Sequence, residues 1–131
     1  IASTVLPLGA TINMDGTALY VGIVSVFAAQ AFGIDLSLTD YALIAGSTTL
    51  VSVGTAAVPG ASLFLIAAVM QTIGMSPEQI AVVIGFILPF DRPLDMLRTA
   101  VNIGGDLSVS TAVANWEDEF DKDIFDRPLK Y

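Results

Sequence analysis

The stretch "LGATINMDGTALY" (Leu8–Tyr20) puts an asparagine and an aspartate in the middle of an apolar run. No charged side chain precedes it, and nineteen uncharged residues follow Asp15. At about 1.5 Å per helical residue, such a run comes close to the roughly 30 Å of a bilayer's hydrocarbon core. We therefore expect a discontinuous transmembrane helix over residues 1–34, in which Gly9 and Gly16 let the backbone unwind around "NMDG".

The composition is that of a membrane protein with a charged tail. Of the 131 residues, 54% are hydrophobic and 14% are charged, whereas about 25% are charged in an average soluble domain. Residues 117–131 hold six of the acids and three of the bases, and the sequence has no basic patch, so nucleic acid is not an expected partner. Cysteine and histidine are absent, which excludes disulfides, thiol nucleophiles and zinc sites built on those residues. The chain starts without a methionine or a charged leader, so we expect a fragment whose upstream part is missing.

A run of thirty-seven uncharged residues, from Tyr41 to Pro77, follows the polar connection "DLSLTD" (Asp35–Asp40). One helix of that length would be roughly 55 Å long, too long for a single span. The run is interrupted by "SVGTAAVPGAS" (Ser52–Ser62), which is rich in small residues and contains a proline. We expect a re-entrant helical hairpin over residues 35–76 with its tip at this interruption. The tip is either a site of close packing or a gate that touches a substrate.

The stretch "MSPEQIAVV" predicts the start of the last long helix. Ser76 suits the N-cap, and Gln79 completes a capping box with it. We expect this final transmembrane helix over residues 77–115, bent around Pro89 and Pro93. The expected fold is therefore an all-α membrane protein, with a broken helix, a hairpin, a long final helix and a solvated acidic tail at 116–131.

The stretch "DRPLDMLRTAVNIGGD" carries polar side chains at intervals of 4, 3, 4 and 4 residues, namely Asp91, Asp95, Arg98, Asn102 and Asp106. At about 100° per residue these five side chains, called the polar stripe below, share one face of a helix. Ionised groups within a membrane are costly, so the stripe is either a structural ion-pair seam or a binding face. As a binding face it would use Arg98 for a carboxylate, Asp95 for an ammonium group and Asn102 as an amide clamp. Opposite charges one turn apart fit an acidic amino acid.

The "NMDG" interruption also has two interpretations. It is either a helix kink with a capped end or an ion site in which unwound carbonyls, Asn13 and Asp15 coordinate a hard cation. An intramembrane aspartyl protease would pair Asp15 with Asp106. That enzyme needs a glycine three residues before the second aspartate, where this chain has Ile103. We therefore do not expect an enzyme.

The motifs "ATINMDGTALY", "SVGTAAVPGAS" and "DMLRTAVNIGGD" resemble, in this order, three motifs of the sodium-coupled glutamate/aspartate transporters, within the dicarboxylate/amino acid:cation symporter family. They correspond there to the seventh transmembrane helix, the second re-entrant hairpin and the eighth helix, and the resemblance covers nearly the whole chain except the tail. It implies the C-terminal half of an elevator-type transport domain, and a homotrimer formed through a scaffold domain that this chain lacks. It also implies sodium-driven symport of L-glutamate or L-aspartate across a plasma membrane, most simply a bacterial or archaeal inner membrane, by a multi-pass protein in contact with membrane lipids.

The resemblance implies a role for each matching residue. The substrate side-chain carboxylate would be held by Arg98 and Thr17, the amino group by Asp95 near Thr99 and the Val58 carbonyl, and the main-chain carboxylate by Asn102. Asp91 and Tyr20 would position Arg98. One sodium site would use the carbonyls of Gly9, Asn13 and Asn102 with the Asp106 carboxylate. A second would use Thr11 with carbonyls around Ser52, Val53 and Thr55, and a third would use Asn13 and Asp15 with partners on a missing helix.

A few residues separate the branches of this family. "NMDGT" together with Asp106 favours sodium, and Arg98 with Asp95 favours acidic amino acids. The alternatives are a proton-coupled symporter, or one for C4-dicarboxylates or neutral amino acids. Val21 stands where animal excitatory transporters carry a glutamate linked to proton countertransport, which argues against proton and potassium coupling. Ala57 and Ser62 stand where the family usually has tip glycines, so we expect the tip geometry to differ.

Overall fold

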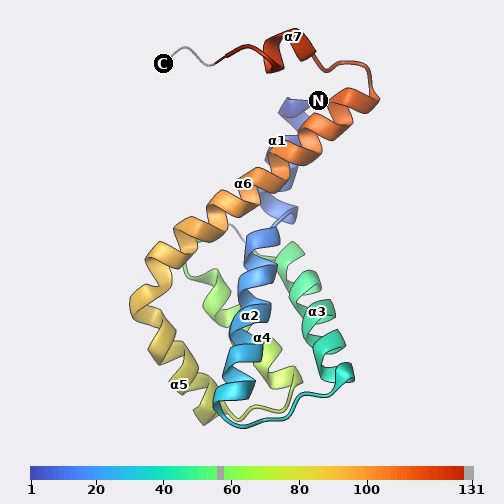
Figure 1. Cartoon of the computed structure of the whole chain (residues 1–131). Coiled ribbons are helices and arrows are strands. Elements are labelled where there is room, and N and C mark those ends of the chain that lie inside the picture. Colours follow the sequence, from blue (N-terminus) through green and yellow to red (C-terminus); the bar gives the residue numbers. More distant parts are fainter. Residues whose placement is uncertain (56–57, 129–131) are drawn as a thin grey trace.

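The computed structural model of the chain describes residues 1–55 and 58–128. Every regular element in this part is helical, which confirms the expected all-α fold (Figure 1). The elements are α1 (Ala2–Ile12), α2 (Asp15–Ala31), α3 (Leu38–Val53), α4 (Ala61–Thr72), α5 (Pro77–Ile87), the 3₁₀ turn η1 (Leu88–Phe90), α6 (Asp91–Trp116) and the short α7 (Lys122–Phe125).

The first helical segment is interrupted at Asn13 and Met14, inside the stretch where the sequence predicts a break. These two residues have φ of −106° and −116° and ψ of 88° and 56°, which are not helical angles. The expectation that Gly9 and Gly16 let the backbone unwind is wrong, because both lie inside helices, in α1 and α2 respectively.

The two glycines instead allow close packing against α6. A Cβ on Gly16 would lie 2.6 Å from the backbone oxygen of Arg98, and one on Gly9 would overlap the carboxylate of Asp106. Gly105 plays the same part from the α6 side, since its Cβ would lie 2.8 Å from Nδ2 of Asn13. The glycines thus bring the two ends of the helix break against the polar stripe.

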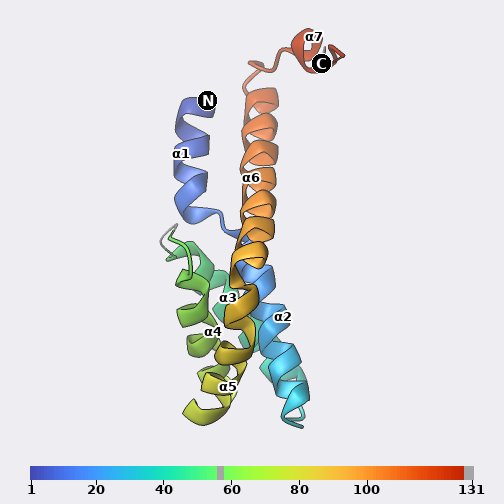
Figure 2. The same ribbon diagram turned by 90° about the vertical axis from the view of Figure 1, so that its left-hand side faces the viewer.

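Helix α6 forms the long axis of the molecule and packs against both α1 and α2 (Figures 1 and 2). In Figure 2, α1 runs beside the C-terminal half of α6, whereas α2 lies beside its N-terminal half. The break between α1 and α2 therefore faces the middle of α6.

Helices α3 and α4 form a hairpin that packs against α2. Helix α3 begins with a capping box that the sequence analysis did not identify: the Ser37 N–H donates to the Asp40 carboxylate at 2.8 Å, and the Asp40 N–H donates to Ser37 Oγ at 3.3 Å. Helix α4 starts after Gly60, whose φ of 82° lies in the left-handed region that favours glycine. Ala57 lies outside the described residues. The re-entrant position of the hairpin in a membrane stays a prediction.

The last long helix is preceded by α5 and a sharp turn. The predicted capping box is confirmed, because the Ser76 N–H donates to Gln79 Oε1 at 2.9 Å and the Gln79 N–H donates to Ser76 Oγ at 3.3 Å. Pro89 lies in the turn η1, which separates α5 from α6. Pro93 falls in the first turn of α6, where a missing N–H costs little.

The apolar core lies between α2, α3, α4 and α5 and includes the buried residues Val21, Ile44, Ile66, Val69 and Met70. Many large apolar side chains are nevertheless exposed, such as Leu50 at 77% and Phe64 at 80%. Within the described residues, one stretch, Ala2–Ala31, is long and apolar enough to cross a membrane by length and composition. The exposed apolar surface is what a chain surrounded by lipid or by further protein would present.

Candidate functional site

Helix α6 buries its charged face and exposes its apolar face. Asp91, Arg98 and Asp106 are 5%, 5% and 6% exposed, whereas Met96 and Leu97 are 73% and 65% exposed. A helix at the surface of a soluble protein has the opposite polarity. Because burying a charge is unfavourable unless it is paired and hydrogen-bonded, the partners of these side chains define the site.

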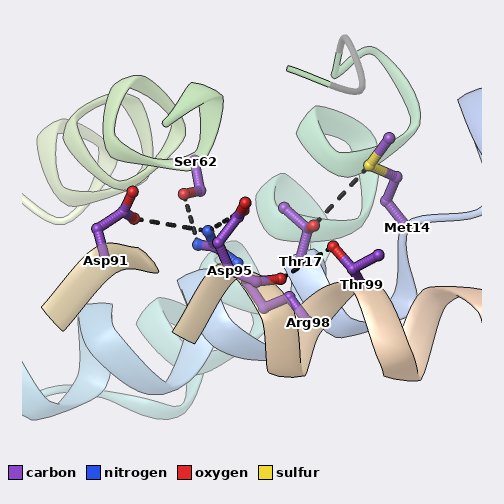
Figure 3. A network of polar contacts seen from close by, with 7 residues as sticks. All are labelled: Met14, Thr17, Ser62, Asp91, Asp95, Arg98 and Thr99. Atoms are coloured by element: carbon purple, nitrogen blue, oxygen red, sulfur yellow. Dashed lines mark hydrogen bonds and ion pairs between the residues drawn. The ribbon is translucent and has the colours of Figure 1, made fainter. Parts of the chain in front are cut away.

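The Arg98 guanidinium lies at the centre of this network (Figure 3). Its Nη2 donates to the Asp95 carboxylate at 2.6 Å and lies 3.5 Å from Oδ1 of Asp91. Its Nη1 donates to the hydroxyl of Ser62, which comes from the first turn of α4. The cation is therefore held between two carboxylates of its own helix and a hydroxyl of the hairpin.

Tyr20 of α2 completes the surroundings of the guanidinium. The Arg98 Cζ lies 4.3 Å from the centre of the tyrosine ring, a cation–π contact. In the part of the chain that the structure describes, the Tyr20 hydroxyl and Asp91 Oδ1 are buried without a hydrogen-bond partner, although Asp91 keeps its charge contact with Arg98. Asp91 and Tyr20 therefore both lie beside Arg98. That they position it for a substrate stays a prediction.

A pocket of about 310 Å³ opens between α6, the helix break and the described ends of the hairpin. Its volume is at the lower end of the range for small-molecule sites. The pocket brings together all six residues predicted to bind substrate, namely Thr17, Val58, Asp95, Arg98, Thr99 and Asn102. The pocket is also lined by Pro59, Ala61 and Ser62, which belong to the stretch predicted as a packed tip or a gate, and by Ala10 and Met14, which the sequence did not indicate. A larger hollow of about 750 Å³ between α2 and α3 is lined by uncharged side chains among the described residues, so it offers no comparable chemistry.

Asn102 joins α6 to the start of α2. The Gly16 N–H donates to Asn102 Oδ1 at 2.8 Å, so this side chain caps a helix that begins 87 positions earlier at Asp15. With its oxygen held by Gly16, the amide of Asn102 keeps its two N–H donors for the pocket. The backbone of α2 therefore orients the predicted amide clamp.

Asp106 joins α6 to the helix break. Its Oδ1 accepts a hydrogen bond from Asn13 Nδ2 at 2.8 Å, and its carboxylate lies against Gly9, where a Cβ would overlap it. The carbonyl of Gly9 accepts the Asn13 N–H at 2.8 Å. Three of the four residues predicted for the first sodium site, Gly9, Asn13 and Asp106, are therefore in contact, and the fourth, Asn102, lines the same pocket as Asp106.

The other predicted ion-site residues are less closely associated. Thr11 is exposed, and its hydroxyl donates to the Leu8 carbonyl of its own helix at 2.8 Å. Ser52 and Thr55 are buried, with hydroxyls that donate to carbonyls of α3, and Val53 is 51% exposed. Asp15 is exposed in the first turn of α2, next to Gly105. Among the described residues, no group of three or more acidic side chains is placed to hold a metal ion.

An apolar all-helical chain with a small buried charged pocket at a broken helix has the features of a membrane transport protein. Comparison with known proteins agrees, since residues 1–116 match the Sodium:dicarboxylate symporter family. The chain therefore belongs to this family of symporters.

Several curated relatives are similar over most of the chain. It is 44% identical to excitatory amino acid transporter 3 of Mus musculus over 78% of its length. It is 38% identical to the proton/glutamate-aspartate symporter of Escherichia coli K12 over 93%, and 39% identical to the proton/sodium-glutamate symport protein of Bacillus subtilis 168 over 92%. The chain spans 19%, 27% and 27% of the lengths of these three relatives.

Proposed function

We propose that the protein to which this chain belongs is a secondary active symporter that carries L-glutamate or L-aspartate together with sodium ions. The observation that carries this proposal is the buried Arg98 beside Asp95 in a pocket of about 310 Å³. The pocket offers a cation and an anion one helical turn apart, which complement a side-chain carboxylate and an ammonium group. The Escherichia coli relative is named a glutamate-aspartate symporter and the Bacillus subtilis relative a glutamate symport protein, which supports the same substrate class.

Each charged group of the substrate is bound by a different set of pocket residues. Arg98 takes the side-chain carboxylate with help from Thr17, while Asp95 takes the ammonium group beside Thr99 and the Val58 carbonyl. Asn102, whose oxygen is held by the Gly16 N–H, donates its amide hydrogens to the main-chain carboxylate. Asp95 is paired with Arg98 at 2.6 Å. Binding of the substrate would replace this ion pair by two others, one between Arg98 and the substrate carboxylate and one between Asp95 and the substrate ammonium group.

Sodium would be bound at the helix break. The carbonyls of Gly9, Asn13 and Asn102 and the free oxygen of Asp106 supply the hard oxygen ligands that alkali cations prefer. Two further sites follow the same chemistry, one with Thr11 and carbonyls around Ser52, Val53 and Thr55, the other with Asn13 and Asp15. Ion and substrate sites share Asn102, and this shared residue is a direct route for their coupling.

The transport cycle would be an elevator movement of a domain that contains this chain, with the hairpin α3–α4 as its gate. The proposal includes a homotrimer built on parts of the protein outside this chain, in contact with membrane lipids, in the plasma membrane of a bacterium or archaeon. Its support is the resemblance of the three motifs and the family match.

Proton coupling is the second candidate, because the Escherichia coli relative is named a proton/glutamate-aspartate symporter. Asp106 favours sodium, because its carboxylate lies against Gly9 at the helix break, where backbone carbonyls can supply further oxygen ligands. Measuring uptake under a sodium gradient and then under a proton gradient distinguishes sodium coupling from proton coupling.

The substrate assignment can be tested with the full-length protein in liposomes. The wild type should take up aspartate or glutamate, and Arg98→Cys should lower the apparent affinity for both by roughly ten- to a hundredfold, since a charged hydrogen-bonded pair contributes about 1.5–3 kcal/mol. The matched control is Arg92→Cys, an exposed arginine on the same helix. An Arg98→Cys protein with wild-type aspartate affinity would refute the assignment.

A further inference from the structure

Ser62 makes a contact that the proposed function does not use. It lies in the first turn of α4, is 4% exposed, and accepts a hydrogen bond from Nη1 of Arg98, 36 positions later in the chain (Figure 3). The Ser62 side chain also lines the pocket. A buried hydroxyl directed at the substrate-binding cation is therefore part of the site.

The contact differs in origin from the other partners of the guanidinium. Asp91 and Asp95 both approach Nη2, and both belong to α6, the helix that carries Arg98 itself. Tyr20 of α2 lies against the flat face of the group. Among the hairpin residues that the structure describes, Ser62 is the one that hydrogen-bonds to the guanidinium, and it does so at the opposite nitrogen, Nη1.

The geometry gives this hydroxyl a defined effect. A guanidinium is planar and has five N–H donors and no acceptor, so fixing both terminal nitrogens fixes the orientation of the whole fork. The two carboxylates attract only the Nη2 side. Without a partner at Nη1, the guanidinium can rotate towards the carboxylates. Its remaining N–H donors then no longer point in a fixed direction for a ligand.

We propose that Ser62 is a positioning residue for Arg98, which makes the orientation of the guanidinium depend on the seating of α4. This inference rests on the proposed function, since it concerns how the same pocket binds acidic amino acids. The guanidinium of Arg98 has the orientation that binds a carboxylate when α4 is packed as in this structure. Binding of the side-chain carboxylate is therefore coupled to the position of the hairpin. Ser62 acts on substrate affinity and leaves the transport step itself unchanged.

The test is aspartate uptake by the full-length protein in proteoliposomes, with KM and kcat measured separately. Ser62→Ala removes the hydroxyl but keeps the Cβ, and alanine is well tolerated in the first turn of a helix. It should raise the KM for aspartate about tenfold, the effect of one hydrogen bond to a charged group, with kcat within about twofold. Ser62→Thr keeps a hydroxyl at the same position and should restore the KM to within about threefold of the wild type.

The matched control is Ser25→Ala. Ser25 is also fully buried, but its hydroxyl donates to the Val21 carbonyl within α2, so this change should leave the KM for aspartate unaltered. An unchanged KM in Ser62→Ala would overturn the inference, and so would equal losses in Ser62→Ala and Ser62→Thr. A wild-type protein that takes up no acidic amino acid would instead overturn the proposed function, so the two failures are distinguishable.

Discussion

Gly9→Ala tests the proposed sodium site through a change that adds a single methyl group. The new Cβ would overlap Oδ1 of Asp106 and lie 2.8 Å from its Cγ. The carboxylate must therefore shift, and we expect its 2.8 Å hydrogen bond with Asn13 to be lost. Both residues belong to the proposed sodium site, so the change alters the ligands of the ion without removing any of them.

The size of the effect follows from three contributions. Overpacking costs about 1–3 kcal/mol, and a lost hydrogen bond to a charged group costs about 1.5–3 kcal/mol. Alanine in place of glycine stabilises a helix by about 1 kcal/mol. At the lower end of each range the folded protein loses about 1.5 kcal/mol of stability. The helix term is the same with and without the ion, so the affinity for sodium depends on the displaced carboxylate: a loss of about 1.5 kcal/mol in its contacts corresponds to roughly a tenfold weaker site.

The assay is aspartate uptake by the full-length protein in liposomes as a function of sodium concentration. The half-saturating sodium concentration should rise about tenfold in Gly9→Ala. Gly104→Ala is the matched control, because among the described residues a Cβ there meets nothing within 4 Å, although it lies on α6 two positions before Asp106. A sodium dependence that Gly9→Ala leaves unchanged, or that Gly104→Ala shifts equally, would refute the reasoning.

Two further predictions concern stability. Gly16→Ala should lower the thermal midpoint of the full-length protein more than Gly22→Ala does, because its Cβ would lie 2.6 Å from a backbone oxygen of Arg98, whereas the nearest atom to a Cβ on Gly22 is a methyl carbon at 3.8 Å; equal midpoints would contradict this. Hydrogen bonds from the hydroxyl and N–H of Ser37 hold the pKa of the Asp40 carboxyl below its ordinary value. A lowered pKa in the folded state gives stability that is present above the unfolded pKa and is lost as the pH falls through the folded one. The difference in midpoint between the wild type and Asp40→Asn should therefore shrink at acid pH, and a difference that stays constant would count against the cap.

The polar stripe could be predicted from the sequence because it depends only on helical periodicity. Five side chains at intervals of three and four residues must share a face, and burial of Asp91, Arg98 and Asp106 confirms that this face points inward. The break at Asn13 could be located for a similar local reason, since polar residues interrupt an apolar run.

The structural role of Gly9 and Gly16 could not be predicted from local sequence. Glycine is compatible with an unwound backbone and with close helix packing, and the neighbours that decide between them lie about ninety positions away in α6. The contact of Ser62 with Arg98 was missed for the same reason, because it joins two helices with no shared sequence pattern. The capping box at Ser37 was different, since Ser-x-x-Asp before an apolar run is a local signal that the sequence did contain.

The central claim is that the charged pocket carries an acidic amino acid and that the helix break couples its movement to sodium. The most direct measurement is the accumulation of labelled aspartate in liposomes that contain the full-length protein, under an inward sodium gradient at equal pH and, separately, under an inward proton gradient without sodium. We predict accumulation with the sodium gradient and little with the proton gradient. Accumulation that follows the proton gradient and ignores sodium would contradict the account.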